Sequence, residues 1–273
     1  AGTLPMVTLA RSVAAAGVRR VSGALVGDAS GFDDGKVPDG WRRRYLHASY
    51  AARVSALSFN ENQVIVLVRP DGRRADISFR PAVSGMDVSN NVRVLAGSRG
   101  ASIRVRQDSI AGRIVISGWI GAKSPERDYK LVVENPELFA VGALRAALQA
   151  EGVTVDGPIR IATPRDPLTP VATLPSPTLD RIIEQMNGES NNHYAELLFR
   201  NVARAAGSPG SAETANSLLG RFLRDKVRAV LGAGSKQIVM NLSDVSYMDS
   251  AGLGELVSAH AAAARQGAAL KLA

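Results

Sequence analysis

The stretch QVIVLVRPDGRRADISFR, residues 63–80, decides the architecture of the first half of the chain. It contains two β-like apolar runs, 63–70 and 74–80, and the pair Asp71-Gly72 stands between them. An Asp-Gly pair suits the positive φ angles of a tight turn between antiparallel strands. The pattern therefore predicts a β-hairpin over these residues.

Short apolar runs of the same kind continue on both sides of the hairpin, between Val21 and Val133. Each is followed by turn residues, and the runs are VSGALVG, VRVLAG, ASIRVRQ and RIVISGWIG. Before them, apolar positions at helical spacing predict a helix over residues 4–18. We therefore expect one helix and then a β-rich region from 21 to 133.

The later part of the chain is mainly helical. Asn135 can cap a helix and Pro136 suits its first turn, so LFAVGALRAALQAEG is predicted to be helical. A strand VDGPIRIAT and a proline-rich connector follow, and then three helical stretches, at 178–187, 191–206 and 212–230. The last stretch has the pattern of a compact α/β unit, with strand KQIVMNL, a loop, helix AGLGELVSAHAAAARQG and strand AALKLA.

The composition excludes several classes of protein. Of the 273 residues 45% are hydrophobic and 21% charged, which is typical of a globular protein. No apolar run approaches the ~18 residues of a membrane span, and no charged-then-apolar leader is recognisable, so we expect neither a transmembrane segment nor an export signal in these residues. The absence of cysteine excludes disulfides, thiolate metal sites and cysteine nucleophiles.

The net charge of +8 is spread along the sequence. Nucleic-acid binding requires clustered cations or interleaved aromatic residues, and aromatic residues are only 5% of the chain, so no nucleic-acid partner is predicted. An affinity for anionic polymers of the cell envelope, or a plain solvated surface, fits the charge better.

The segment MNGESNNHYAE, residues 186–196, carries the most specific pattern. It resembles the second active-site motif of class C penicillin-binding proteins, the serine D-Ala-D-Ala carboxypeptidase/endopeptidases of the S13 type. Further matches occur in the same order along the chain: GVRRVSGALVGDASGF, VPDGW, VSALSFNENQV and ENPELFAVGALRAAL. The resemblance covers roughly residues 1–225, and the β-rich middle corresponds to domains that such enzymes insert within their catalytic domain.

The resemblance implies a peptidase chemistry that uses three motifs. A serine attacks the terminal peptide bond and forms an acyl-enzyme, and a lysine one helical turn later, in an SxxK motif, acts as its base. In the second motif, SxN, a serine passes protons and an asparagine holds the substrate amide. This motif maps onto Ser190 and Asn192, and the implied partners are the peptidoglycan stem peptide and β-lactams. A KTG-type strand binds the substrate carboxylate.

Two of the three motifs do not occur in this sequence. No lysine has a serine three positions before it, and none is followed by Thr-Gly or Ser-Gly; the lysines are Lys36, Lys123, Lys130, Lys226, Lys236 and Lys271. Because acylation needs both nucleophile and base, we expect the chain as it stands to be inactive.

A plainer interpretation of residues 190–192 is an ordinary helix N-cap, since Ser and Asn are the residues that favour that position. A second SNN triplet, at 89–91, shows that the triplet also arises by chance. His193 is expected on a helix surface, and His47 and His260 have no partners at metal-ligand spacing. The sequence predicts no metal site and no cofactor.

The segment IVMNLSDVSYMDSAGLG, residues 238–254, resembles part of a STAS domain, the fold of anti-sigma-factor antagonists. The resemblance spans about 222–273 and implies phosphorylation of Ser250 by a partner anti-sigma kinase. A phosphate there would lie at a helix N-terminus, where free N–H groups and the helix dipole stabilise it. The alternative is that Asp249 and Ser250 simply cap the helix of an α/β fold.

We therefore expect an α/β and β-rich multidomain chain. It would comprise a remnant of a penicillin-binding, β-lactamase-like catalytic domain at 1–20, an inserted β-rich region at 21–133, the return of the catalytic domain with SxN at 134–221, and a partial STAS unit at 222–273. The first part implies a place in the cell envelope or periplasm and the last implies the cytoplasm. Since both families have a helix at the junction, between about 218 and 230, a chimera without function is a further interpretation.

Overall fold

The computed structural model describes residues 4–39, 41–108, 113–241 and 250–272. They fall into two compact units, of which one is formed by Ala1–Ser30 with Trp41–Pro177 and the other by Gly31–Gly40 with Thr178–Ala273. The short segment 31–40 therefore belongs with helices that follow it by some 140 residues or more. The boundaries expected from the sequence, at 20, 133 and 221, stay predictions.

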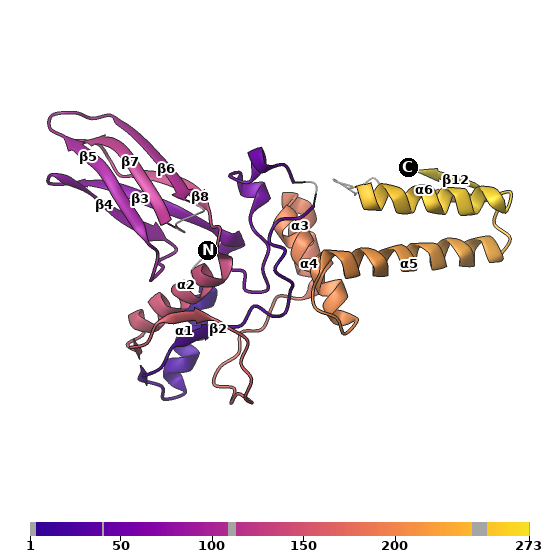
Figure 1. Cartoon of the computed structure of the whole chain (residues 1–273), viewed down its shortest axis with the longest axis horizontal. Coiled ribbons are helices and arrows are strands. Elements are labelled where there is room, and N and C mark those ends of the chain that lie inside the picture. Colours follow the sequence, from indigo (N-terminus) through magenta and orange to yellow (C-terminus); the bar gives the residue numbers. More distant parts are fainter. Residues whose placement is uncertain (1–3, 40, 109–112, 242–249, 273) are drawn as a thin grey trace. The chain divides into compact units, whose positions relative to one another are not determined.

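The first unit contains a six-stranded sheet in the order β6-β7-β5-β4-β3-β8 (Figure 1). Its strands are β3 (Gln63–Asp71), β4 (Arg74–Arg80), β5 (Val88–Leu95), β6 (Ala101–Asp108), β7 (Arg113–Gly121) and β8 (Arg127–Val132). Neighbouring strands are antiparallel except β5 and β7, which are parallel. The predicted hairpin is confirmed, because Asp71 pairs with Arg74 and Gly72 between them has φ 55°.

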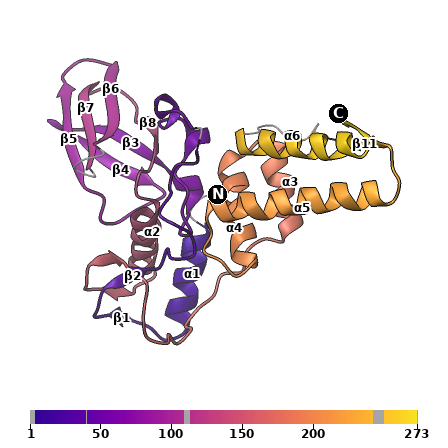
Figure 2. The same ribbon diagram turned by 45° about the vertical axis from the view of Figure 1, so that its right-hand side comes forward.

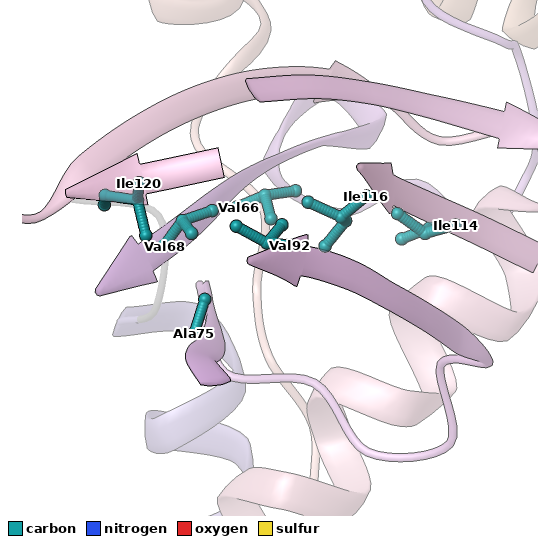
Figure 3. Packing of buried hydrophobic residues seen from close by; sticks show 7 residues of the cluster. All are labelled: Val66, Val68, Ala75, Val92, Ile114, Ile116 and Ile120. Carbon is teal, nitrogen blue, oxygen red and sulfur yellow. The ribbon is translucent and has the colours of Figure 1, made fainter. Parts of the chain in front are cut away.

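Alternation along the strands puts branched apolar side chains on one face of this sheet. Figure 3 shows these side chains directed toward one another across the curled sheet; they are Val66, Val68, Ala75, Val92, Ile114, Ile116 and Ile120. The two edge strands approach each other as well, since the backbone N–H of Glu134, just after β8, donates to Oε1 of Gln107 in β6 at 3.1 Å. The other face of the sheet carries charged and polar side chains together with apolar ones, among them Leu67 and Trp119.

Two helices and four short strands complete the first unit. Helix α1 (Leu4–Ala15) packs on α2 (Pro136–Ala150) through Ala10, Ala147 and Leu148. Pro136 occupies the first turn of α2 as expected, whereas Asn135 stands at the N-cap without a capping side-chain bond. The strands β1 (Arg20–Val21) with β9 (Thr154–Val155), and β2 (Leu25–Gly27) with β10 (Ile159–Ile161), form parallel pairs, and short 3-10 turns lie at Arg43–Tyr45, Ser49–Ala51 and Asn60–Asn62.

Two runs that the sequence presents as continuous strands are each divided. The run VSGALVG becomes β1 and β2, and VDGPIRIAT becomes β9 and β10. At the break, Gly157 lies directly against the backbone carbonyl of Gly23, where a Cβ atom would not fit. The chains therefore pass closely at this point instead of continuing one regular ladder.

The second unit is mainly helical (Figure 2). Its elements are α3 (Leu179–Glu189), α4 (Asn192–Ala205), α5 (Ala212–Gly232), β11 (Gln237–Met240), α6 (Ser250–Arg265) and β12 (Ala269–Leu272). The parallel pair β11–β12 shares a core with α5 and α6 that includes Val227, Leu231 and Ala263. One unbroken helix, α5, crosses the predicted junction at 218–230. Within the described parts of the chain, no helix is long and apolar enough to cross a membrane.

Candidate functional site at the turn between α3 and α4

Ser190 forms the sharp turn between two helices. Helix α3 ends at Glu189, and Ser190 follows in the left-handed region with φ 51° and ψ 48°. Its side chain is exposed. Non-glycine residues adopt this conformation rarely, and among the described residues only the 60–62 turn shows it besides Ser190. Ser190 is the C-cap of α3, a position at which helices commonly adopt the left-handed conformation, usually with glycine.

Asn191 has the capping role in this triplet. It is the N-cap of α4, and its Oδ1 accepts a hydrogen bond from the backbone N–H of Tyr194 at 3.0 Å. The helix-cap interpretation therefore applies to the middle residue of the triplet. Ser190 caps neither helix with its side chain, and Asn192 is the first, half-buried residue of α4.

His193, the next residue, is buried with only 3% of its surface exposed. The expectation that it lies on the helix surface is therefore wrong. Neither ring nitrogen has a hydrogen-bond partner in the described structure. Burial disfavours the charged imidazolium and lowers the pKa of His193 to about 4. The ring is thus neutral near pH 7 and packs in the interior beside the turn as an uncharged group.

Arg200 lies two helical turns further on the same face of α4 and is also buried. Its guanidinium donates to Oδ1 of Asp33 and to the carbonyl oxygen of Gly35, each at 2.5 Å. It also donates to the carbonyl oxygen of Gly210 at 3.4 Å and stands 5.9 Å from the ring of Phe32. This one side chain ties the segment 31–40 to the helix that begins with the SxN motif.

Sequence reasoning did not find the role of Arg200. Two of its partners, Gly35 and Asp33, lie 165 and 167 residues earlier in the chain, and local patterns carry no information about such pairs. At helical spacing Arg200 shares a face with His193 and Ala203, and the structure shows that all three are buried.

The other polar features of the chain have simpler explanations. In the second SNN triplet, on β5, Asn90 donates from Nδ2 to the carbonyl oxygen of Ala75 at 2.8 Å and has a structural role. The described residues contain no cluster of three His, Asp or Glu that could hold a metal ion. Ser250 is the first residue of α6, as expected for a helix start, and Asp249 lies outside the described residues.

Residues 4–243 match the D-Ala-D-Ala carboxypeptidase 3 (S13) family. The chain belongs to this family. The S13 match includes the second half of α5, from residue 222, and β11, which the sequence interpretation assigned to a STAS unit, and it ends before α6. No evidence from these comparisons supports the STAS resemblance.

Individual relatives agree with this assignment. The S13 chain is 28% identical over 216 residues to a D-alanyl-D-alanine carboxypeptidase of Actinomadura sp. (strain R39), and the match covers 74% of this chain and 40% of the relative. It shares its fold with penicillin binding protein 4 of Haemophilus influenzae, with a TM-score of 0.61, 19% identity, and coverage of 81% of this chain and 49% of the other. A second structure of that protein, in complex with a β-lactam, gives a TM-score of 0.54 at 16% identity, with coverage of 82% and 49%. The S13 chain thus spans less than half of the length of these proteins.

Proposed function

We propose that the α3–α4 turn forms the SxN wall of a serine-type D-Ala-D-Ala carboxypeptidase/endopeptidase site. In this proposal Ser190 passes protons and Asn192 holds the amide of a peptidoglycan stem peptide or a β-lactam. The proposal rests on the different structural roles of the three residues 190–192. Asn191 caps α4 with its side chain, and Ser190 ends α3 through its backbone alone, so the exposed hydroxyl of Ser190 is not used to cap either helix.

The 273 residues do not contain the rest of the chemistry. The reaction needs a serine oxygen to attack the peptide carbonyl, a lysine to take its proton, and a strand to hold the terminal carboxylate. No SxxK and no KTG occurs in the sequence. The proposed function of this chain alone is therefore weak, non-covalent recognition of the peptide. As a part of an S13 enzyme its place is the cell envelope.

Ligand titration of the 273-residue chain tests this proposal. Chemical-shift changes or heat release on adding an acyl-D-Ala-D-Ala peptide should be lost in Ser190→Ala and in Asn192→Ala. The triplet on β5 offers matched controls, because Ser89→Ala and Asn91→Ala remove the same atoms from the other SNN. Equal binding by all four variants would refute the role of Ser190 and Asn192.

A second candidate function concerns the C-terminal residues, where α6 begins at Ser250 between the parallel strands β11 and β12. This strand–helix–strand arrangement is what the STAS resemblance requires locally. Under this alternative, a cytoplasmic anti-sigma kinase would phosphorylate Ser250. Incubation with such a kinase and ATP, followed by mass spectrometry of the peptide 241–255, should show phosphate that is lost in Ser250→Ala. Phosphate on Ser243 or Ser246 alone would contradict the alternative.

A further inference from the structure

The outward face of the six-stranded sheet carries a group of exposed arginines on β4, β5 and β6. We call it the arginine face; it consists of Arg74, Arg93, Arg104 and Arg106. In Figure 1 these strands lie at the upper left, with β7 between β5 and β6. The strands present alternate residues to this face, because the intervening positions point into the apolar core.

Strand pairing places these side chains in rows across the sheet. One row runs from Arg74 through Arg93 and Trp119 to Ser102, since each is the direct neighbour of the next on adjacent strands. The next row runs from Asn91 through Ser117 to Arg104. Because adjacent strands are about 4.8 Å apart, β5 and β6 lie about 10 Å apart on the two sides of β7, and Arg104 is also displaced from Arg93 by two residues along the strands. That spacing leaves room for one extended chain over β7.

Carboxylates on the same face balance part of the charge of the arginine face, since Asp71 is the direct cross-strand neighbour of Arg74 and Asp108 follows Arg106 on β6. Arg69 and Arg113, at its margins, have ion pairs with Asp76 and Asp87. No ion pair to Arg74, Arg93, Arg104 or Arg106 is found within the described structure. Arg74 and Arg93 even stand directly opposite each other, an arrangement that costs stability in a sheet. An unfavourable pair of like charges on an open face is relieved by a bound anion.

Trp119 adds an apolar surface among these cations. It is half-buried and directed over the sheet, and the tip of its indole lies against Gly100, where an added Cβ would be 3.1 Å from the ring. Ser102, Ser117 and Asn91 surround it with hydroxyl and amide groups. A flat aromatic ring with hydrogen-bonding neighbours suits the face of a sugar ring, and guanidinium groups suit carboxylates by paired hydrogen bonds.

We propose that the arginine face binds a carboxylate-bearing polysaccharide. The polymer lies along β7, with a sugar on Trp119 and acidic groups on the arginines of β5 and β6. Nucleic acid fits less well, because single strands are bound on several stacked aromatic residues and this face has one. The surface is separate from the SxN turn and its binding does not depend on the proposed peptidase role.

Binding of the full chain to immobilised polygalacturonate tests this inference. We expect saturable binding that weakens with salt, and a loss of about fivefold in affinity for each of Arg93→Ser and Arg104→Ser. Arg165→Ser, which removes an exposed arginine elsewhere in the same unit, is the matched control and should bind as the parent does. Arg93→Ser also relieves the opposition to Arg74, so its thermal stability should not fall and lost binding will not reflect unfolding.

Trp119→Leu separates sugar recognition from charge. It should weaken binding to polygalacturonate but leave binding to inorganic polyphosphate, a polyanion without sugar rings, unchanged. The inference is overturned if Arg165→Ser weakens binding as much as Arg93→Ser does, or if Trp119→Leu has no effect. It is also overturned if polyphosphate or duplex DNA binds more tightly than polygalacturonate at equal ionic strength.

Discussion

Acid should destabilise the helical unit through His193. The unfolded histidine has a pKa near 6.5, whereas burial lowers the pKa in the folded chain to about 4. Between these values the unfolded state binds more protons, so stability is fully present above pH 6.5 and is lost as the pH falls toward 4. Protonation of His193 in the unfolded state therefore lowers the free energy of unfolding by about 2 kcal/mol at pH 5 and by about 3 kcal/mol at pH 4.

Replacement of the ring by an apolar side chain removes this dependence. Between pH 7 and pH 5, the free energy of unfolding of His193→Leu should fall by about 2 kcal/mol less than that of the parent chain. At pH 7 the variant should be as stable as the parent or more stable, because a buried ring without hydrogen-bond partners is removed. Urea unfolding followed by circular dichroism at 222 nm measures it, because most helices lie in the second unit. His260→Leu, at an exposed position of α6, is the control. Parallel pH curves for the parent and His193→Leu would refute the reasoning.

Two further predictions concern the fold. Arg200→Met should lower the free energy of unfolding by about 2 kcal/mol, because it leaves the carboxylate of half-exposed Asp33 and two carbonyl oxygens without their donor. Arg204→Met, at an exposed position of the same helix, is the control and should have little effect. Urea titration of both variants measures the difference. In hydrogen exchange the slowest amides should belong to the six-stranded sheet, above all β3 and β7, because these strands are paired on both sides and bury their apolar face; slower exchange after residue 222 would contradict this.

The sequence predicted those elements whose cause is local. The hairpin at Asp71-Gly72 follows from turn chemistry and alternation, and Pro136 marks the first turn of α2. The start of α6 at Ser250 was predicted as well. In each case residues close in the chain decide the conformation, so a pattern of a few positions is sufficient.

Features with long-range causes were missed. The break between β1 and β2 depends on Gly157, which lies far along the chain from Gly23. The burial of His193 depends on what covers α4, and residue polarity gave the wrong answer there. The attachment of segment 31–40 depends on Arg200. For the candidate site, the sequence identified the SxN triplet but could not tell that Asn191 alone would cap the helix and leave Ser190 in a left-handed turn.

The most direct test of the central claim is the intact mass of the chain after incubation with benzylpenicillin. We propose that the chain carries one wall of an S13 site, and its sequence lacks the nucleophile and the base. We therefore expect the mass of 28.7 kDa to stay unchanged at any time and any concentration that saturates non-covalent binding. A stoichiometric penicilloyl adduct, on Ser190 or on any other serine, would contradict it.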